Sequence, residues 1–526
     1  MEHKVLYGNN GQPPRAEAYI DQKKQKRAFL KFKSRYGNLY IYDAITNMIF
    51  PDIHGFSEII ENYYIMNKDD IILKIGCKYG KDTVLKNFDY IYKLINRFGA
   101  FYFKKSDFMG NRIFVSQDNF HNHIVNVRQI VLEVTQACNL RCSYCVYSGR
   151  YKDYRTHNEV HMSDEIAIKS IDKYLSLISS DERTAKSGRV FINFYGGEPL
   201  LNFQLIKKVV HHVKKLLANG IAIEDRIYFT LTTNGLLLKG DILDYIIEND
   251  FLLAISLDGP EAENDKNRIL NSQKGSFDAV WKNIDNIFTQ HRDYIDSHIV
   301  FLSTVHPNHN IIEIDNFFDN LFHDRYNRLK ISLEKDGDYK DRINFFKELK
   351  NKYFSDESFD NISHFSPFIN GFYGPVYRKF YNRYFMGRNG KYTSTCSPDD
   401  FRLFVSSLGN FHICERINTN FSIGNYETGI DYDRVKTVFD RYDNVLVNNR
   451  CDQCLAKNSC FLCFATAAHG DDFVIDREKC EDQIKLTEAS LSDLVSYFEK
   501  DEDKILSFLF PGMIEEDDNT LMKAFY

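Results

Sequence analysis

The sequence predicts an α/β protein whose central part is a parallel β-sheet. Three observations support this: strands and helical patterns alternate through the middle of the chain, small strands and then helices precede them, and cysteines crowd the last third. At 526 residues the chain is too long for one compact core, so two to four domains are expected. The patterns suggest an N-terminal α+β domain at 1–122, a core at 123–345, a bridging region at 346–395, a cysteine-rich domain at 396–483 and an acidic helical tail at 484–526.

The N-terminal segment contains short hydrophobic runs separated by turn-forming residues. Strands are expected at 28–32, 39–43 and 47–50, and helices at 56–64 and 83–98. This order fits a small winged-helix-like or scaffold domain. Cys77 is expected to be a small buried core residue. His121 and His123 are expected at the surface, because no cysteine or carboxylate stands at ligand spacing from them.

Six hydrophobic runs in the central region have the length and composition of buried strands. They span 127–134, 189–194, 227–231, 252–257, 299–304 and 329–333. Helical periodicity lies between them at 167–178, 205–217 and 279–288, with Ser163 as the expected N-cap of the first helix. Such alternation indicates parallel strands joined by right-handed crossovers, that is, an α/β barrel or part of one. Ligands of such folds bind at the carboxyl ends of the strands.

Charge and hydropathy exclude some classes of partner. A net charge of −6 and a pI near 6.3 give no electrostatic footprint for nucleic acid. No stretch approaches the ~18 apolar residues of a membrane span, and the N-terminus lacks a secretory h-region. We therefore expect a cytoplasmic protein with no nucleic-acid or membrane partner. In a reducing compartment disulfides are unlikely, so the seven cysteines from Cys396 to Cys480 are better explained as metal ligands.

Three cysteines directly follow the first core strand. Cys138, Cys142 and Cys145 are separated by three and then two residues. Three thiolates this close can bind three irons of a [4Fe–4S] cluster and leave the fourth iron open, whereas such clusters usually take four cysteines. A zinc knuckle is the alternative, since this spacing also suits zinc and His157 and His161 follow in a polar stretch.

The run CNLRCSYC, with Tyr144 before its last cysteine, resembles the CxxxCxxC signature of radical SAM enzymes. The resemblance implies a six-stranded partial (β/α)6 barrel and a cluster whose open iron binds S-adenosylmethionine. One electron then cleaves this cofactor to a 5′-deoxyadenosyl radical. It also implies cofactor contacts from strand-end motifs, namely Gly196, Gly197, Glu198 and Pro199 of FYGGEP, Thr233 and Asn234, Ser256 and Asp258, Arg268 of NDKNR, and Val305. Taken alone, FYGGEP would be an ordinary strand-to-helix turn and Arg268 a surface charge.

The later cysteines resemble those of the SPASM domain, which houses two auxiliary iron–sulfur clusters. One spacing departs from that pattern, because Cys460 and Cys463 have two residues between them where three are usual. The resemblance implies a distal cluster on Cys451, Cys454, Cys460 and Cys480, and a proximal cluster on Cys396, Cys414 and Cys463. The proximal cluster is then one cysteine short, so Asp399, Asp400, His412 or a substrate thiolate would complete it. A pair of structural zinc sites is the alternative.

These motifs predict a radical SAM maturase of ribosomally made peptides, of the sactipeptide or ranthipeptide type. The expected product is a thioether from a cysteine sulfur to a carbon atom, and the expected partners are a precursor peptide and a flavodoxin- or ferredoxin-type electron donor. The N-terminal domain would recognise the leader of the precursor. The alternatives are an anaerobic sulfatase-maturing, formylglycine-generating enzyme and a non-catalytic iron–sulfur electron-transfer or scaffold protein.

Overall fold

The structure is a computed structural model. It describes residues 26–103, 127–151, 154–179, 189–220, 227–322, 329–333, 348, 402–460 and 462–500. Several residues singled out above lie outside these ranges: His121, His123, Cys396, Asp399 and Asp400, together with all of the bridging region except residue 348.

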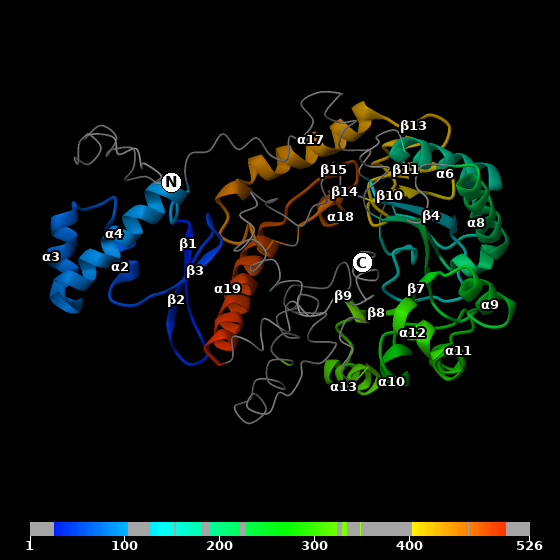
Figure 1. Ribbon diagram of the computed structural model, residues 1–526, viewed down its shortest axis with the longest axis horizontal. Coiled ribbons are helices and arrows are strands. Elements are labelled where there is room, and N and C mark those ends of the chain that lie inside the picture. The colour runs from blue at the N-terminus through cyan, green and yellow to red at the C-terminus, as the bar shows by residue number, and fades with distance from the viewer. Residues whose placement is uncertain are drawn as a thin grey trace.

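The N-terminal part is a three-stranded antiparallel sheet followed by three helices (Figure 1). Its strands are β1 (Phe29–Lys33), β2 (Leu39–Asp43) and β3 (Met48–Pro51), and its helices are α2 (Phe56–Asn62), α3 (Lys68–Tyr79) and α4 (Lys81–Phe98). The strands lie where the sequence predicts them. Helix α3 was not predicted; its buried residues are only Ile71, Ile75 and Gly76, while its other apolar residues Ile72 and Leu73 are not buried.

The expectation that Cys77 is buried is wrong. Cys77 is exposed on α3, with its thiol directed to the carbonyl oxygen of Leu73 at 3.1 Å. It follows the buried Ile75 by two positions, and two positions on a helix are roughly 200° apart, so it lies on the opposite face.

Six parallel strands form one end and the larger part of the ten-stranded sheet, side by side in chain order. They are β4 (Gln129–Thr135), β5 (Val190–Gly196), β6 (Ile227–Thr233), β7 (Leu252–Ser256), β8 (Ile299–Val305) and β9 (Leu329–Leu333). The helices between them include α6 (Asp164–Ser179), α8 (Phe203–Ala218), α9 (Asp241–Glu248), α10 (Glu261–Asn264), α11 (Phe277–Gln290), α12 (Arg292–His298) and α13 (Ile311–Phe322). All six predicted strands are present, and Ser163 Oγ accepts from the amide of Ile166 at 3.2 Å in the first turn of α6.

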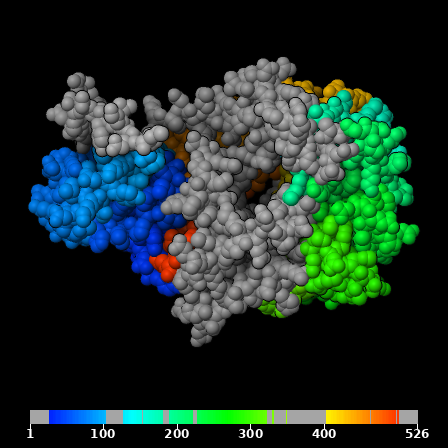
Figure 2. Space-filling model, in the orientation of Figure 1, coloured from blue at the N-terminus to red at the C-terminus, as the bar shows by residue number. Residues whose placement is uncertain are grey.

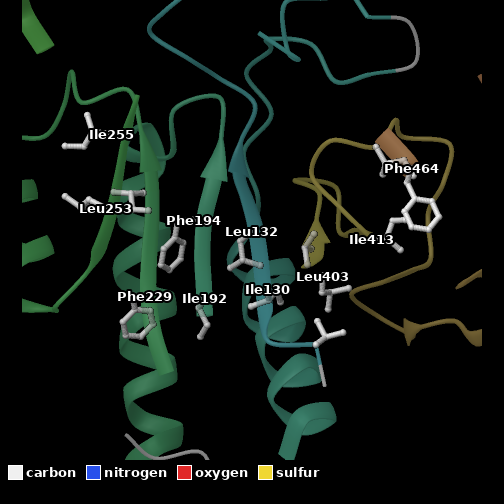
Figure 3. Close-up of a cluster of buried hydrophobic side chains, with 14 of the residues drawn as sticks. Ile130, Leu132, Ile192, Phe194, Phe229, Leu253, Ile255, Leu403, Ile413 and Phe464 are labelled. Atoms are coloured by element: carbon white, nitrogen blue, oxygen red, sulfur yellow. The ribbon is translucent and has the colours of Figure 1, made fainter. Parts of the chain in front are cut away.

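One face of this sheet carries the main hydrophobic core. Alternate residues of β4 and β5, such as Leu132 and Phe194, are fully buried in a cluster with side chains of α6 and α8, including Ile171 and Val209. Figure 3 shows how the cluster continues from the core strands to residues far along the chain, namely Leu403, Ile413 and Phe464.

The sheet continues into the cysteine-rich segment. Strand β10 (Arg402–Val405) pairs in parallel with β4, and β11 (Asn410–His412), β12 (Gly424–Asn425) and β13 (Gly429–Ile430) extend the sheet in antiparallel fashion to ten strands. The remaining elements are α17 (Tyr432–Asn448), the 3-10 helix η3 (Cys451–Gln453), α18 (Phe464–Ala467), β14 (Ala468–His469), β15 (Asp472–Phe473) and α19 (Arg477–Lys500). One mixed sheet thus joins two regions that the sequence analysis treats as separate domains.

Helix α19 connects the cysteine-rich segment to the N-terminal sheet. It begins at Arg477, earlier than the expected tail at 484, and packs beside β1 (Figures 1 and 2). Ser492 Oγ donates to the carbonyl of Lys33 at 2.6 Å, and Arg35 Nε lies 3.3 Å from Asp493 Oδ1. Among the helices that the structure describes, none is both long and apolar enough to cross a membrane.

Candidate functional site

The three-cysteine loop leaves the carboxyl end of β4 and is anchored on residues 267–269. The amide of Arg141 donates to the carbonyl of Ile269 at 2.8 Å, and the amide of Ser143 donates to that of Asn267 at 3.1 Å. Ser143 Oγ also donates to Asn267 Oδ1 at 2.6 Å. The loop therefore has a backbone shape imposed by the protein and not only by a bound metal.

The three thiols are half-buried side by side in this loop. The pKa of Cys138 and of Cys145 is raised to about 12, mainly by burial and in part by charge on Cys142. Burial also raises the pKa of the Cys142 thiol. Such thiols stay neutral until a metal displaces their protons, and thiolates are the ordinary ligands of iron–sulfur clusters. The donor set therefore fits an iron–sulfur cluster.

The two glycines of FYGGEP let β5 approach the start of the cysteine loop. A Cβ on Gly196, whose φ is +146°, would lie 2.1 Å from the carbonyl oxygen of Thr135. A Cβ on Gly197 would lie 2.2 Å from the carbonyl oxygen of Ala137. The amide of Gly197 donates to Thr135 at 2.9 Å. These glycines are thus required for backbone packing directly before Cys138.

Glu198 joins FYGGEP to the end of β6. Its buried carboxylate accepts from Thr233 Oγ1 at 2.8 Å, from the amide of Asn234 at 2.8 Å and from the amide of Leu200 at 3.1 Å. Burial raises its pKa to about 7, while these hydrogen bonds oppose the rise. Asn234 Nδ2 in turn donates to Asn139 Oδ1 at 2.7 Å, inside the cysteine motif. Two motifs far apart in sequence therefore meet at the cysteine loop.

The half-buried Tyr144 and the buried Asp258 and Arg268 form a polar array at the loop. The Tyr144 hydroxyl donates to Asp258 Oδ2, and Arg268 Nη1 donates to the Tyr144 hydroxyl at 2.9 Å. Burial by itself lowers the pKa of Arg268, but Tyr144, Cys142 and Asp258 together raise it well above its usual value. A permanently charged, forked donor beside the cysteines suits a carboxylate ligand.

The other predicted contacts are placed as follows. Pro199 opens the 3-10 helix η1 (Pro199–Asn202), and Ser256 ends β7 in a half-buried position. Val305 is buried in the hydrophobic core, 1% exposed, whereas its neighbour Thr304 is half-buried and its amide donates to Asp258 Oδ1 at 2.9 Å.

Asn267 is an important residue that the sequence analysis did not single out. Besides its bonds to Ser143, its side-chain amide donates to His309 Nε2 at 2.7 Å and to Asn308 Oδ1 at 3.0 Å. It therefore ties the cysteine loop to the segment that follows β8. The sequence feature that could have identified Asn267 as a site residue is its position next to Arg268 in NDKNR.

In the cysteine-rich segment, four of the cysteines are neighbours. Burial raises the pKa of Cys451 to about 12, and charges on Cys454, Cys460 and Cys480 raise it further. The first three come from η3 and the loop after it, and Cys480 comes from α19. This is the set that the SPASM resemblance assigns to the distal cluster.

Cys414 and Cys463 lie on segments that pack together through aromatic rings. The ring of Phe421 stacks on Phe473 at 4.6 Å, and Phe473 contacts Phe464 at 5.8 Å. Cys463 precedes α18 and accepts from Thr466 Oγ1 at 3.7 Å. The structure does not describe Cys396, the third cysteine assigned to this site.

His412 is buried, and its Nδ1 lies 3.2 Å from the carbonyl of Phe421. Burial lowers its pKa to about 4, so the ring is neutral. Over the ranges that the structure covers, no group of three or more His, Cys, Asp or Glu side chains is arranged so that it could hold a metal ion. The fit of iron–sulfur clusters therefore rests on the donor type, the anchored loop and the neighbouring polar array.

Comparisons with known proteins agree with this site. Residues 132–321 match the model of the Radical SAM superfamily. A serine-type anaerobic sulfatase-maturating enzyme of Bacteroides thetaiotaomicron is 31% identical over 162 residues, which is 31% of this chain and 36% of that protein. The radical SAM cyclopropyl synthase TigE of Paramaledivibacter caminithermalis is 30% identical over 177 residues, 32% of this chain and 34% of that protein. The chain thus spans about a third of the length of these curated relatives.

Solved structures show the same fold over a longer stretch. The structure described as native anSMEcpe with bound AdoMet has a TM-score of 0.52 and 17% sequence identity, and the match covers 70% of this chain and 99% of that chain. Radical SAM proteins bind a [4Fe–4S] cluster and S-adenosylmethionine, and the described thiols and polar array fit both. The chain therefore contains a radical SAM domain, similar to that of the anaerobic sulfatase-maturating enzymes.

Proposed function

We propose that the protein is a radical SAM peptide maturase. The observation that carries this proposal is the anchored loop of Cys138, Cys142 and Cys145 with the polar array of Tyr144, Asp258 and Arg268 beside it. When bound, the cluster supplies the electron that cleaves S-adenosylmethionine to a 5′-deoxyadenosyl radical. The chain itself supplies the geometry that brings a substrate C–H bond to that point.

The strand-end residues bind and orient S-adenosylmethionine. Glu198 and Asn234 provide acceptors for its amino group, and Arg268 provides a guanidinium for its carboxylate. Gly196 and Gly197 keep the β5 backbone close to the loop, Tyr144 and Ser256 border the pocket, and Thr233, Asp258 and Val305 support these groups. Burial of most of them keeps water away from the reacting atoms.

The cysteine-rich segment binds two auxiliary clusters in the manner of a SPASM domain. Cys451, Cys454, Cys460 and Cys480 hold the distal cluster, and Cys396, Cys414 and Cys463 hold the proximal one. The set of three leaves one iron of the proximal cluster open to a substrate thiolate. That open position supports thioether formation between a cysteine sulfur and a carbon atom of a ribosomal peptide.

The N-terminal domain recognises the leader of the precursor peptide. Strand β3 is an edge strand of its sheet, and an extended peptide can add to such an edge. Large apolar side chains are also exposed on this domain, namely Tyr36, Leu39, Ile53, Ile65, Leu73, Leu85, Tyr90, Tyr92 and Phe98. An exposed sheet edge and exposed apolar side chains on the same domain suit an amphipathic leader.

Sulfatase maturation is the second candidate, because the chain is similar to sulfatase-maturating enzymes in sequence and in fold. TigE, which is equally similar, is named a cyclopropyl synthase. Similar radical domains therefore occur with different products, so the domain alone does not identify the bond that forms. The N-terminal domain and the open proximal iron favour a leader-bearing peptide.

The test is to incubate the reconstituted enzyme with S-adenosylmethionine, a flavodoxin or ferredoxin reducing system, and the short peptides encoded beside its gene. We expect 5′-deoxyadenosine, loss of two hydrogens from one peptide, and about 12 iron per chain at ~4 per cluster. A sulfatase-derived peptide forms the comparison arm, and formylglycine in that arm alone would favour the second candidate. Absence of 5′-deoxyadenosine, or bound zinc instead of iron, would contradict the proposal and favour a non-catalytic role.

A further inference from the structure

A fully buried ion pair lies between the two metal-binding regions. Glu133, on β4, and Arg155, in the segment after the cysteine loop, have side chains 0% and 2% exposed, with Nε 3.0 Å from Oε1. Both oxygens of the Glu133 carboxylate also accept hydrogen bonds. Its donors are the Tyr147 hydroxyl at 2.5 Å, Gln136 Nε2 at 3.1 Å, and the amide and hydroxyl of Ser407 at 2.8 and 2.9 Å.

Arg155 contacts segments from both halves of the site. Its guanidinium lies 5.4 Å from the ring centre of Tyr147, two residues after Cys145, and 4.6 Å from that of Phe404 on β10. Its Nη2 donates to the backbone carbonyl of Glu415, the residue directly after Cys414. One side chain thus connects the segment of the first cluster to a predicted ligand of the second.

Tyr195 indicates that these two segments face a common space. Its Cα lies opposite that of Glu133 in the register of β4 and β5. The pKa of Tyr195 is raised mainly by burial and further by charges on Glu415 and Cys145.

Stability of the fold does not by itself explain a guanidinium at this position. Burying two charges costs desolvation energy, and well-packed apolar side chains of similar volume stabilise a core as well or better. Apolar side chains cannot, however, bond to two segments at once in a fixed direction, as a forked guanidinium does.

We propose that Arg155 is a positioning residue that holds the loop after Cys414 against β4 and the segment that follows the three-cysteine loop. It does so through the ion pair of its Nε with Glu133 and the hydrogen bond that its Nη2 donates to the Glu415 carbonyl. These contacts of Arg155 set the placement of the two metal-binding segments around the substrate. This part of the proposal rests on the proposed function. The bonds themselves are independent of the reaction.

The test compares Arg155→Lys with the matched surface variant Arg434→Lys, whose ion pair with Asp431 is exposed. A lysine keeps the charge but cannot reach both partners. We expect backbone amides of 407–416 to exchange with deuterium about tenfold faster in Arg155→Lys. We also expect the ratio of peptide product to 5′-deoxyadenosine to fall about tenfold, with 5′-deoxyadenosine formation within about threefold of the wild type. Arg434→Lys should match the wild type in all three.

A double variant separates positioning from stability. Arg155→Met alone leaves the Glu133 carboxylate buried and unpaired, whereas Glu133→Gln with Arg155→Met removes both charges together. We expect the double variant to recover thermal stability but not the slow exchange of 407–416, because the bond to Glu415 is still missing. Recovery of both would show a purely structural pair and overturn the proposal.

Wild-type exchange in Arg155→Lys would also overturn the proposal. Failure of the proposed function has a different signature, because the wild-type protein would then form no 5′-deoxyadenosine at all. The exchange measurement still tests Arg155 in that case.

Discussion

The two cysteine regions are built in different ways. The three-cysteine loop stands at the carboxyl end of a parallel strand, and the chain of residues 267–269 holds it by backbone hydrogen bonds. Its neighbours Glu198, Tyr144 and Arg268 are buried or half-buried and bonded to one another or to adjacent strands. The later cysteines instead lie on short loops, on the brief helix η3 and on α19.

This difference indicates a division of roles. The carboxyl ends of the parallel strands are rigid and hold a cofactor in a defined orientation, which radical chemistry requires. Loops that gather cysteines from η3 and α19 obtain more of their order from the metal that they bind. The shape of the first site is therefore expected to tolerate nearby substitutions, except at the residues that contact the loop. The order of the second site is expected to depend on its cysteine ligands.

The largest effect is expected from replacing Cys138, Cys142 and Cys145 together by alanine. Formation of 5′-deoxyadenosine should fall below detection, because the cluster loses all of its ligands, and iron should fall by ~4 per chain. Iron analysis and chromatography of the reaction measure both. Cys77→Ala is the matched control, since this cysteine is exposed and outside both sites. Retained cleavage in the triple variant would contradict the assignment.

Gly196→Ala tests whether the close approach of β5 shapes the loop. The new Cβ would lie 2.1 Å from the Thr135 carbonyl, so the free energy of unfolding should fall by about 3 kcal/mol or more. Cluster assembly should fall with it. Gly220→Ala is the control, because Gly220 also has a positive φ, +86°, but nothing within 4 Å of its Cβ position. It should cost only about 1–2 kcal/mol. Equal losses in denaturant titrations would show that backbone strain, not the contact, determines the effect.

Arg268→Lys tests the carboxylate contact. A lysine cannot reproduce the forked donor, so we expect affinity for S-adenosylmethionine to fall roughly 10- to 100-fold, about 1.4–2.8 kcal/mol. Calorimetric titration of the cluster-loaded protein measures this. Arg292→Lys, on the exposed surface of α12, should bind as the wild type does. Unchanged affinity in Arg268→Lys would remove Arg268 from the cofactor site.

Cys480→Ala should affect cofactor cleavage least. We expect ~4 fewer iron per chain and about tenfold less peptide product, with 5′-deoxyadenosine formation within about threefold of the wild type. The reason is that Cys480 lies on α19, near Cys451 of the distal set, and is not part of the three-cysteine loop. If iron content did not change, Cys480 would not be a ligand. If cleavage stopped as well, the two regions would not be independent.

Much of the core was predictable because its signals are local. Six buried strands stand out as apolar runs, and the three-cysteine motif and FYGGEP are contiguous residues with a recognisable chemistry. Helix α3 was missed because its apolar stripe is short, and Cys77 was misjudged because residue type alone does not tell which face of a helix it occupies.

The residue types of the site are therefore predictable from the sequence alone. They are three thiols after a strand, a glycine pair, and polar residues at strand ends. How these residues come into contact is seen only in the tertiary structure. It showed that the glycines serve the approach of β5 to the loop, that Asn267 anchors the loop, and that β10 joins the cysteine-rich segment to β4. It also placed Arg155 between both regions. These contacts join residues tens to hundreds of positions apart, and such pairings depend on packing and register, which no local pattern encodes.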